Sequence, residues 1–199
     1  MLKELDLKGL ICPKPVIMTK KELESSDCKT LIVTVDNTFA KENILKLCKS
    51  LYLSTEILKE KENEITIKII KEENFKEENS KEKKENNIEN KCRMISNDKL
   101  GQGSEELGNV LIKGFIYTLT ELNTFPKYII LLNSGVKLST QNSDTVENLK
   151  ILEENGVEIM SCGTCLDYYG LKESLKVGSV TNMYNIVEIL KSVENNITL

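Results

Sequence analysis

The chain has 199 residues and a formal net charge of −4, with six cysteines and neither histidine nor tryptophan. The missing histidine excludes Ser-His-Asp triads, Cys-His proteases and histidine-bearing zinc sites, because each needs an imidazole. With one arginine, Arg93, and 5% aromatic residues, the chain is poorly supplied for bidentate phosphate or base-edge contacts and for base stacking. Chemistry at neutral pH therefore falls to thiolates and carboxylates, and no nucleic-acid partner is expected.

Residues 1–70 are predicted to form a small α+β two-layer sandwich in the order βαβαββ. Its predicted elements are a strand with Leu5 and Leu7, a helix from Pro13, a strand over 31–35, a helix carrying apolar residues from Ala40 to Leu51, and a strand pair over 53–58 and 65–69. The two helices are expected on one face of the sheet.

Residues 71–91 read KEENFKEENSKEKKENNIENK and are predicted to be a charged, flexible linker. Phe75 and Ile88 are its sole large apolar residues, too few to offset the entropy lost on ordering. An exposed helix held by Glu–Lys pairs is the competing interpretation.

Residues 92–199 are predicted to form a mostly parallel, doubly wound α/β sheet. The first predicted strand begins at Met94, and the other strands cover 128–132, 157–160 and 177–180. The predicted helices cover 104–122, 144–154 and 182–193. Asp144 and Glu147 fit a capping arrangement at the start of the second helix.

The N-terminal residues lack the apolar segment of a signal peptide and carry Glu4 and Asp6 early. The longest strongly apolar run, 128–132, is too short to span a bilayer, so no membrane partner is expected. Without a secretion signal, the six cysteines are expected to be thiols rather than disulfides. The sequence therefore predicts a cytoplasmic protein.

Cys12 precedes Pro13-Lys14-Pro15 at the predicted start of the first helix. Proline fits the first helical turn, where its missing N–H leaves no bond unmade. Cys12 then lies at or just before the N-cap, where unpaired amides and the helix dipole favour a thiolate. A buried cysteine beside a helix-starting proline is the other interpretation, and local physics alone leaves both open.

Asp6, Gly9 and the Cys12-Pro13-Lys14-Pro15 segment resemble the TusA (SirA-like) family of sulfur carriers, whose hallmark is Cys-Pro-x-Pro. The resemblance covers about the first 70 residues, a size typical of a small domain. It implies that Cys12 accepts a persulfide from a donor enzyme and passes it on. In that case Pro13 and Pro15 shape the site.

Cys162 and Cys165 follow the predicted strand 157–160, at the edge of the sheet where sites collect in α/β folds. Thr164 and Asp167 fit a capping box, which predicts a helix from Cys165.

Four interpretations of this pair compete. A zinc site lacks two further ligands unless a second copy supplies them. A thioredoxin-like module needs a proline downstream, whereas Pro126 lies upstream. A dithiol that accepts, resolves or releases sulfur is favoured. Two small buried residues in a tight loop, with no function, remain the fourth interpretation.

The second half also resembles the DsrE/F-like sulfur-relay fold, in which a cysteine after a sheet strand carries the persulfide. The resemblance rests on three segments: 133–136 (NSGV), 162–165 (CGTC) and 180–184 (VTNMY). The order of a Cys-Pro-x-Pro domain, a linker and this domain is similar to the YedF family, described as sulfurtransferase-like selenium metabolism proteins. The selenium role comes from this resemblance alone. Residues 133–135 also read as a simple turn, or as part of one crevice with Cys162.

These observations predict a sulfur or selenium carrier that relays a persulfide or perselenide between Cys12 and the Cys162/Cys165 pair. Gly163 and Thr164 are expected to shape the pair, and one of its thiols is expected to resolve the adduct as a disulfide. The donor is expected to resemble a cysteine desulfurase, the acceptor is unidentified, and no metal or organic cofactor is expected. The alternative function is a non-catalytic, redox-sensing or regulatory module. Three cysteines receive no role: Cys28, Cys48 and Cys92.

Overall fold

The computed structural model describes residues 2–25, 27–71 and 87–199. The chain divides into two compact units, Met1–Lys83 and Lys84–Leu199, each with its own buried core. Most of the predicted linker, residues 72–86, lies outside the described residues. None of the helices in the described part of the chain has the length and apolar character that crossing a membrane requires.

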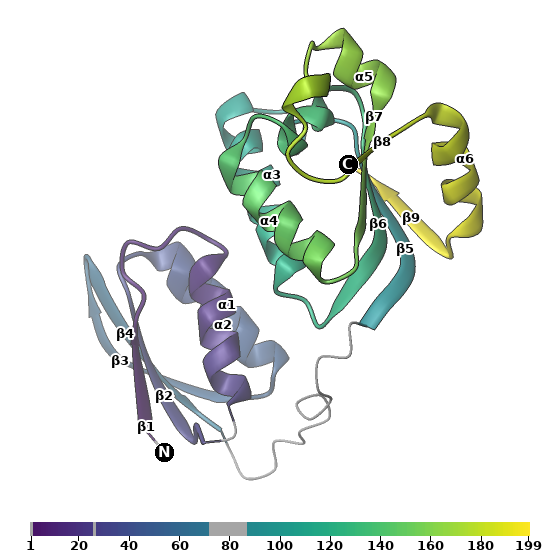
Figure 1. Ribbon diagram of the computed structural model, residues 1–199. Coiled ribbons are helices and arrows are strands. Elements are labelled where there is room, and N and C mark those ends of the chain that lie inside the picture. Colours follow the sequence, from purple (N-terminus) through teal and green to yellow (C-terminus); the bar gives the residue numbers. More distant parts are fainter. Residues whose placement is uncertain (1, 26, 72–86) are drawn as a thin grey trace. The chain divides into compact units, whose positions relative to one another are not determined.

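The first unit is a four-stranded sheet with two helices, which confirms the predicted α+β sandwich (Figure 1). The strand order is β1-β2-β4-β3, with β1 parallel to β2 and the other neighbours antiparallel. Its elements are β1 Leu2–Asp6, α1 Lys14–Glu24, β2 Thr30–Val35, α2 Thr38–Ser50, β3 Ser54–Lys61 and β4 Glu64–Ile70.

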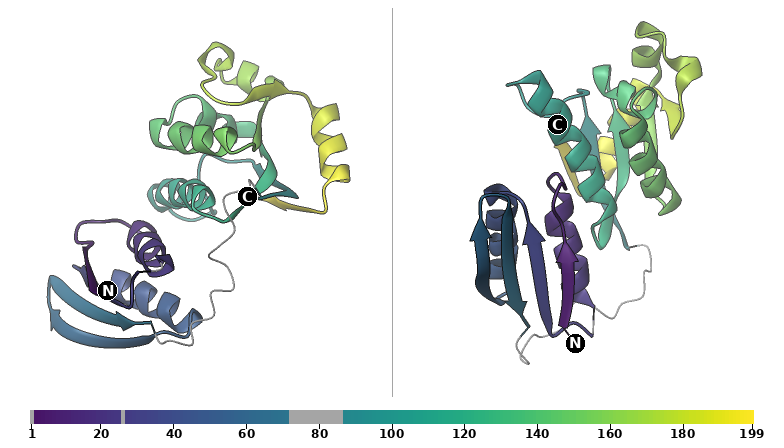
Figure 2. Two further views of the ribbon diagram at one scale, coloured as in Figure 1. Left: turned by 60° about the horizontal axis from the view of Figure 1, so that its bottom comes forward. Right: turned by 90° about the vertical axis from the view of Figure 1, so that its left-hand side faces the viewer.

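Alternating side chains on the two central strands make the core of this unit. Every second residue is buried on β2 and on β4, which places these side chains on one face of the sheet. Helices α1 and α2 cover that face (Figure 2). Burial of each large aliphatic side chain contributes about 1.5–3 kcal/mol, so this face holds both helices and the loops that precede them. The buried strand residues are Leu31, Val33, Val35, Ile65, Ile67 and Ile69.

The second unit is a five-stranded sheet in the order β8-β7-β6-β5-β9, and all its neighbouring strands are parallel. This confirms the predicted parallel α/β sheet. Its elements are β5 Asn87–Ile95, α3 Glu105–Thr120, β6 Thr124–Leu131, the 3₁₀ helix η1 Asn133–Ser139, α4 Ser143–Glu154, β7 Glu158–Cys162, α5 Gly163–Tyr168, the 3₁₀ helix η2 Lys172–Ser174, β8 Ser179–Thr181, α6 Met183–Ser192 and β9 Asn195–Thr198.

Helices pack on both faces of this sheet (Figures 1 and 2). On β6, Ile129 and Leu131 join the cluster formed with α3 and α4, whereas Ile130 joins the cluster formed with α6. A strand buried on both faces is expected to read as a continuous apolar run, as residues 128–132 do.

Three features of the second unit differ from the sequence-based expectations. Strand β5 begins at Asn87, within the segment predicted as linker, because it pairs with β6 and β9 on its two sides. Strand β9 was not predicted, and its exposed sequence Asn-Asn-Ile-Thr has no apolar alternation. Helix α4 is capped by Asn142, which accepts a hydrogen bond from the Thr145 N–H, so the predicted cap at Asp144 is wrong.

Candidate functional site

Cys12 lies exposed in the connection between β1 and α1. Pro13 is the N-cap of α1, Pro15 is buried in the first turn, and the Cys12–Pro13 peptide bond is cis. Cys12 therefore directly precedes the N-cap, in the place that the two prolines predict. The two prolines lack N–H groups, so at these two positions the helix start loses no backbone hydrogen bond.

A shallow groove of about 270 Å³ opens beside the Cys12 thiol. Ile11 and Phe39 lie in its wall with 72% and 80% of their surface exposed. The Asn43 side-chain amide donates a long hydrogen bond, 3.9 Å, to Cys12 Sγ. The groove is lined by Leu10, Ile11, Cys12, Pro15, Val16, Asn37, Phe39, Ala40 and Asn43.

The loop that carries Cys12 is tied to the end of β2. Gly9 has a φ of +73°, which favours glycine, and its N–H donates to Asp36 Oδ2 at 2.6 Å. This hydrogen bond, followed by one from the Asn37 side chain, lowers the pKa of Asp36. Sequence analysis missed Asp36, Phe39 and Asn43, because the β2–α2 junction meets the Cys12 loop only in the folded unit.

Cys162 is the last residue of β7 and the N-cap of α5, and only 3% of its surface is exposed. It belongs to the apolar cluster on the α6 face, with Ile130 and Ile186 among its members. Helix α5 begins at Gly163, so the prediction of a helix from Cys165 with a Thr164 cap is wrong. Strand β7 runs directly into α5, since Cys162 both pairs with Thr181 of β8 and is the N-cap of the helix.

Cys165 is half-buried on α5 and packs against the apolar clusters of both sheet faces. The Asn133 N–H donates to Cys165 Sγ at 3.1 Å. Burial, followed by a hydrogen bond with the Cys162 side chain, raises the pKa of Cys165, and the Asn133 N–H opposes that shift. The structure thus brings both thiols of the predicted pair together with a backbone donor from the β6 end.

Gly163 and Thr164, which lie between the two cysteines, differ in how closely neighbouring atoms approach them. A Cβ atom added to Gly163 would lie 3.1 Å from Val180 Cγ1, closer than a side chain is normally accommodated. Thr164 is exposed on α5. Of the two predicted shaping residues, only Gly163 meets a neighbouring strand closely.

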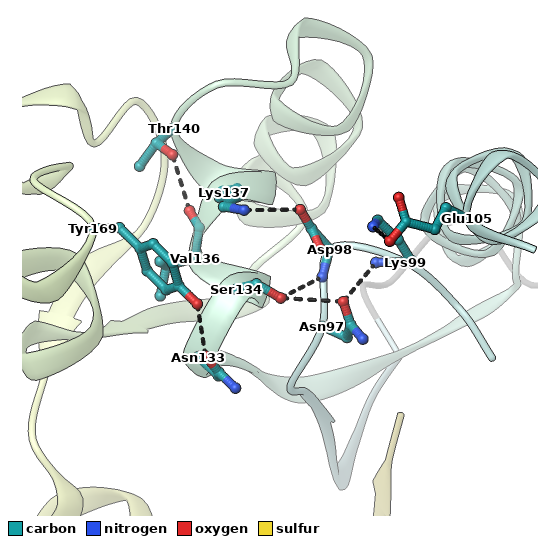
Figure 3. A network of polar contacts seen from close by, with 10 residues as sticks. All are labelled: Asn97, Asp98, Lys99, Glu105, Asn133, Ser134, Val136, Lys137, Thr140 and Tyr169. Atoms are coloured by element: carbon teal, nitrogen blue, oxygen red, sulfur yellow. Dashed lines mark hydrogen bonds and ion pairs between the residues drawn. The ribbon is translucent and has the colours of Figure 1, made fainter. Parts of the chain in front are cut away.

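A polar network holds Asn133 in place (Figure 3). Asn133 has a φ of +47°, and its Oδ1 accepts a hydrogen bond from the Tyr169 hydroxyl at 2.8 Å. Lys137 Nζ lies 5.1 Å from the centre of the Tyr169 ring and 3.2 Å from Asp98 Oδ2. The network therefore joins the ends of β5 and β6 to the end of α5.

The segment 133–136 is also tied to the residues after β5. Ser134 Oγ donates to Asn97 Oδ1 at 3.1 Å and accepts from the Asp98 N–H at 3.2 Å. A Cβ atom on Gly135 would lie 2.3 Å from the Ile95 carbonyl oxygen, so only glycine fits there. The segment forms the 3₁₀ helix η1 rather than a simple turn, and its Asn133 N–H contacts Cys165 of the cysteine pair.

The other three cysteines are buried. Burial raises the pKa of Cys48 and of Cys92 to about 11 and also raises that of Cys28. All six cysteines are free thiols. Among the residues that the structure describes, no three metal-binding side chains gather into one group.

Two family models match the chain, one in each unit. Residues 3–71 match the model described as sulfurtransferase TusA, and residues 122–199 match the DsrE/DsrF-like family. The chain therefore carries a TusA/SirA-like domain, which contains Cys12, and a DsrE/F-like domain, which contains Cys162 and Cys165. A search of the curated proteins finds no match.

Solved structures match parts of the chain. A SirA-like protein from Desulfitobacterium hafniense is 29% identical, covering 35% of this chain and 96% of its own, with a TM-score of 0.32. The ychN protein from Escherichia coli is 20% identical, covering 55% and 98%, with a TM-score of 0.39. A conserved protein of unknown function from Bacteroides thetaiotaomicron is 15% identical, covering 55% and 95%, with a TM-score of 0.41.

Proposed function

We propose that the chain is a sulfur or selenium carrier in which Cys12 accepts the atom and the Cys162/Cys165 pair receives it next. The observation that carries the proposal is the exposed Cys12 thiol beside an open groove in a TusA-like domain. A second pair of thiols in a DsrE/F-like domain of the same chain supports the second step. The pair supplies a dithiol on which a carried atom can be resolved.

The first step is a thiol exchange on sulfur or selenium. The Cys12 thiolate attacks the terminal atom of a donor's persulfide or perselenide, and the donor cysteine leaves as a thiolate. A donor that resembles a cysteine desulfurase fits this step, since such an enzyme presents its cargo on its own cysteine. Ile11 and Phe39 give the donor an apolar surface beside the thiol.

The finer parts of the proposal rest on the order of the two domains. This order resembles that of the YedF family, and the proposed selenium cargo rests on that resemblance alone. The proposed cytoplasmic location rests on the free cysteines, and the acceptor is unidentified. The second candidate function is redox sensing, which is favoured by the position of Cys162 and Cys165 in the first turn of one helix, with Cys165 packed against the cluster that contains Cys162. Sensing would form a disulfide in that pair without any added atom.

The decisive experiment is peptide mass spectrometry of the full chain after incubation with isotopically labelled glutathione persulfide and its selenium analogue. We expect one added atom on the Cys12 peptide and its complete loss in Cys12→Ser. Cys28→Ser is the matched control, because Cys28 lies in the same unit but is buried. It should be labelled like the wild type.

Two results would count against the carrier function. An unmodified Cys12 under these conditions overturns the first step. A reversible Cys162–Cys165 disulfide that forms with an oxidant, while neither donor adds an atom anywhere, would establish redox sensing instead.

A further inference from the structure

We infer that the two thiols of the pair have different tasks: Cys165 takes the sulfur or selenium atom, and Cys162 then releases it as sulfide or selenide. This inference rests on the proposed carrier function and deepens it. It assigns an order to the pair and adds a reaction, the reductive release of the cargo, to carriage alone.

Access separates the two thiols. Cys162 is 3% exposed and belongs to the apolar cluster between the sheet and α6, where an incoming thiol cannot align with it. Cys165 is half-buried at the end of the sheet, beside the exposed residue Asn133. A donor in solution therefore meets Cys165 first, and Cys162 can react only with a group already on Cys165.

The Asn133 N–H gives Cys165 a fixed donor for negative charge. It points at Cys165 Sγ from 3.1 Å, and hydrogen bonds to a charged sulfur are stronger than those to a neutral one. The Asn133 N–H therefore favours the thiolate form of Cys165, which is the form that attacks the terminal atom of an incoming persulfide or perselenide. The hydroxyl of Tyr169 holds the Asn133 side chain and so keeps the N–H in place.

The release step balances without an outside oxidant. The Cys162 thiol loses its proton and attacks Cys165 Sγ, and the bond from Cys165 Sγ to the terminal atom breaks. That atom takes the electron pair and the proton and leaves as HS⁻ or HSe⁻, reduced by two electrons. The two cysteine sulfurs supply those electrons and end as the Cys162–Cys165 disulfide, which a dithiol reductant returns to the starting state.

The first turn of α5 places the two thiols for this step. Cys162 is the N-cap of the helix, and Cys165 packs against the apolar cluster that contains Cys162. Cys162 ends β7 and Cys165 lies one helical turn further on, so the attack needs no change in the chain path.

The experiment loads the pair directly and bypasses Cys12. Full-length protein carrying Cys12→Ser is treated with glutathione persulfide, freed of donor by gel filtration, and assayed for bound sulfur by peptide and for sulfide released. We expect one sulfide per Cys162–Cys165 disulfide in this background. Adding Cys162→Ser should leave a stable adduct on the Cys165 peptide and lower sulfide release at least tenfold, about 1.4 kcal/mol in barrier.

Three further variants make the result decisive. Cys165→Ser should give no adduct on the Cys162 peptide and no sulfide, and Cys162→Ala should repeat the Cys162→Ser result if serine disturbs the apolar site. Cys92→Ser is the matched control, because Cys92 is buried in the same cluster as Cys162. It should release sulfide at the rate of the Cys12→Ser background.

The possible failures are distinguishable. An adduct on Cys162 in the Cys165→Ser protein overturns the assignment of tasks but leaves the carrier function intact. Sulfide release that persists in Cys162→Ser and Cys162→Ala also overturns it. If Cys162→Ser and Cys162→Ala hold no adduct on Cys165 and the Cys12→Ser background releases no sulfide, this inference fails together with the second step of the proposed relay, while labelling of Cys12 is tested separately.

Discussion

The two cysteine sites of this protein differ in how much of each thiol is open to solvent. Cys12 is a single exposed thiol in a surface loop, with apolar side chains exposed beside it. Cys162 and Cys165 are a pair at the end of a parallel strand, where one thiol is buried and the other accepts a backbone N–H. The first domain thus exposes its candidate cysteine, whereas the second buries one cysteine of its pair and half-buries the other.

This difference in exposure indicates which chemical steps each cysteine site can carry out. An exposed single thiol can exchange its cargo with many partners, but among the described residues of its own unit the other two cysteines are buried. A pair with one buried member keeps outside thiols away from that member and can react within itself. The predictions below test whether exposure, packing and hydrogen bonding really divide the two sites in this way.

Alkylation rates should show the largest contrast. In a short pulse of N-ethylmaleimide at neutral pH, we expect Cys12 to be labelled about a hundredfold faster than Cys162, because a buried thiol reacts only after local opening. Peptide mass spectrometry after quenching measures both rates. In denaturant the two rates should converge, and equal rates in the native protein would remove the distinction between the sites.

Packing around the second site should also be less tolerant of change. Gly135→Ala places a Cβ atom against the Ile95 carbonyl, and we expect the free energy of unfolding to fall by about 2–3 kcal/mol. Gly103→Ala is the matched control, since no atom lies within 4 Å of its added Cβ. Urea denaturation followed by circular dichroism measures both. An unchanged midpoint for Gly135→Ala would contradict the close approach of η1 to β5.

The pH dependence of stability should reveal the buried thiols that carry no cargo. The folded pKa of Cys48 is about 11, against an ordinary value of 9.0. Because the pKa is raised, Cys48 keeps its proton to higher pH in the folded state than in the unfolded state. The contribution of the protonated Cys48 thiol to the free energy of unfolding is therefore complete below about pH 9 and is lost between pH 9 and 11. We expect a loss of about 2 kcal/mol that Cys48→Ala lacks.

The Cys12→Ser variant is the control for that measurement. Lysines and tyrosines titrate in the same range, so the comparison is between variants that share them. Cys12→Ser should keep the wild-type pH dependence of the unfolding free energy. A parallel curve for Cys48→Ala would show that Cys48 stays exposed enough to ionise.

The hydroxyl of Tyr169 should have the smallest effect. Tyr169→Phe releases Asn133, whose N–H lowers the pKa of Cys165, so the alkylation of Cys165 should shift to higher pH. Loss of one hydrogen bond is worth about 1 kcal/mol, or about fivefold in rate. Tyr168→Phe is the control, because Tyr168 is 83% exposed. Identical pH profiles for both variants would remove Tyr169 from the positioning of the pair.

Much of the fold could be predicted from local patterns. The alternation of residues 31–35 and 65–69 predicts two half-buried strands, and both are central in the first sheet. The edge strand β9 has no such pattern, since its main chain pairs with β5 but its side chains stay exposed. Periodicity reports buried faces and misses strands held by backbone bonds alone.

The candidate site was predictable chiefly where its residues adjoin in sequence. The prolines after Cys12 indicate a helix start, and Cys162 and Cys165 share one short segment. Asn133 contacts Cys165 across 32 residues, and the contact depends on β6 and β7 being neighbours in the sheet. The donor is also a backbone N–H, so the identity of the side chain gave no signal of its role.

The early start of β5 decides where this protein can be divided. From Asn87 to Glu89 the strand pairs with β6, and from Lys91 onward it also pairs with β9. A fragment that began at residue 92, where the charged composition ends, would lack the residues with which β5 begins its pairing with β6 and with β9. Any fragment intended to carry the DsrE/F-like domain should therefore begin before Asn87.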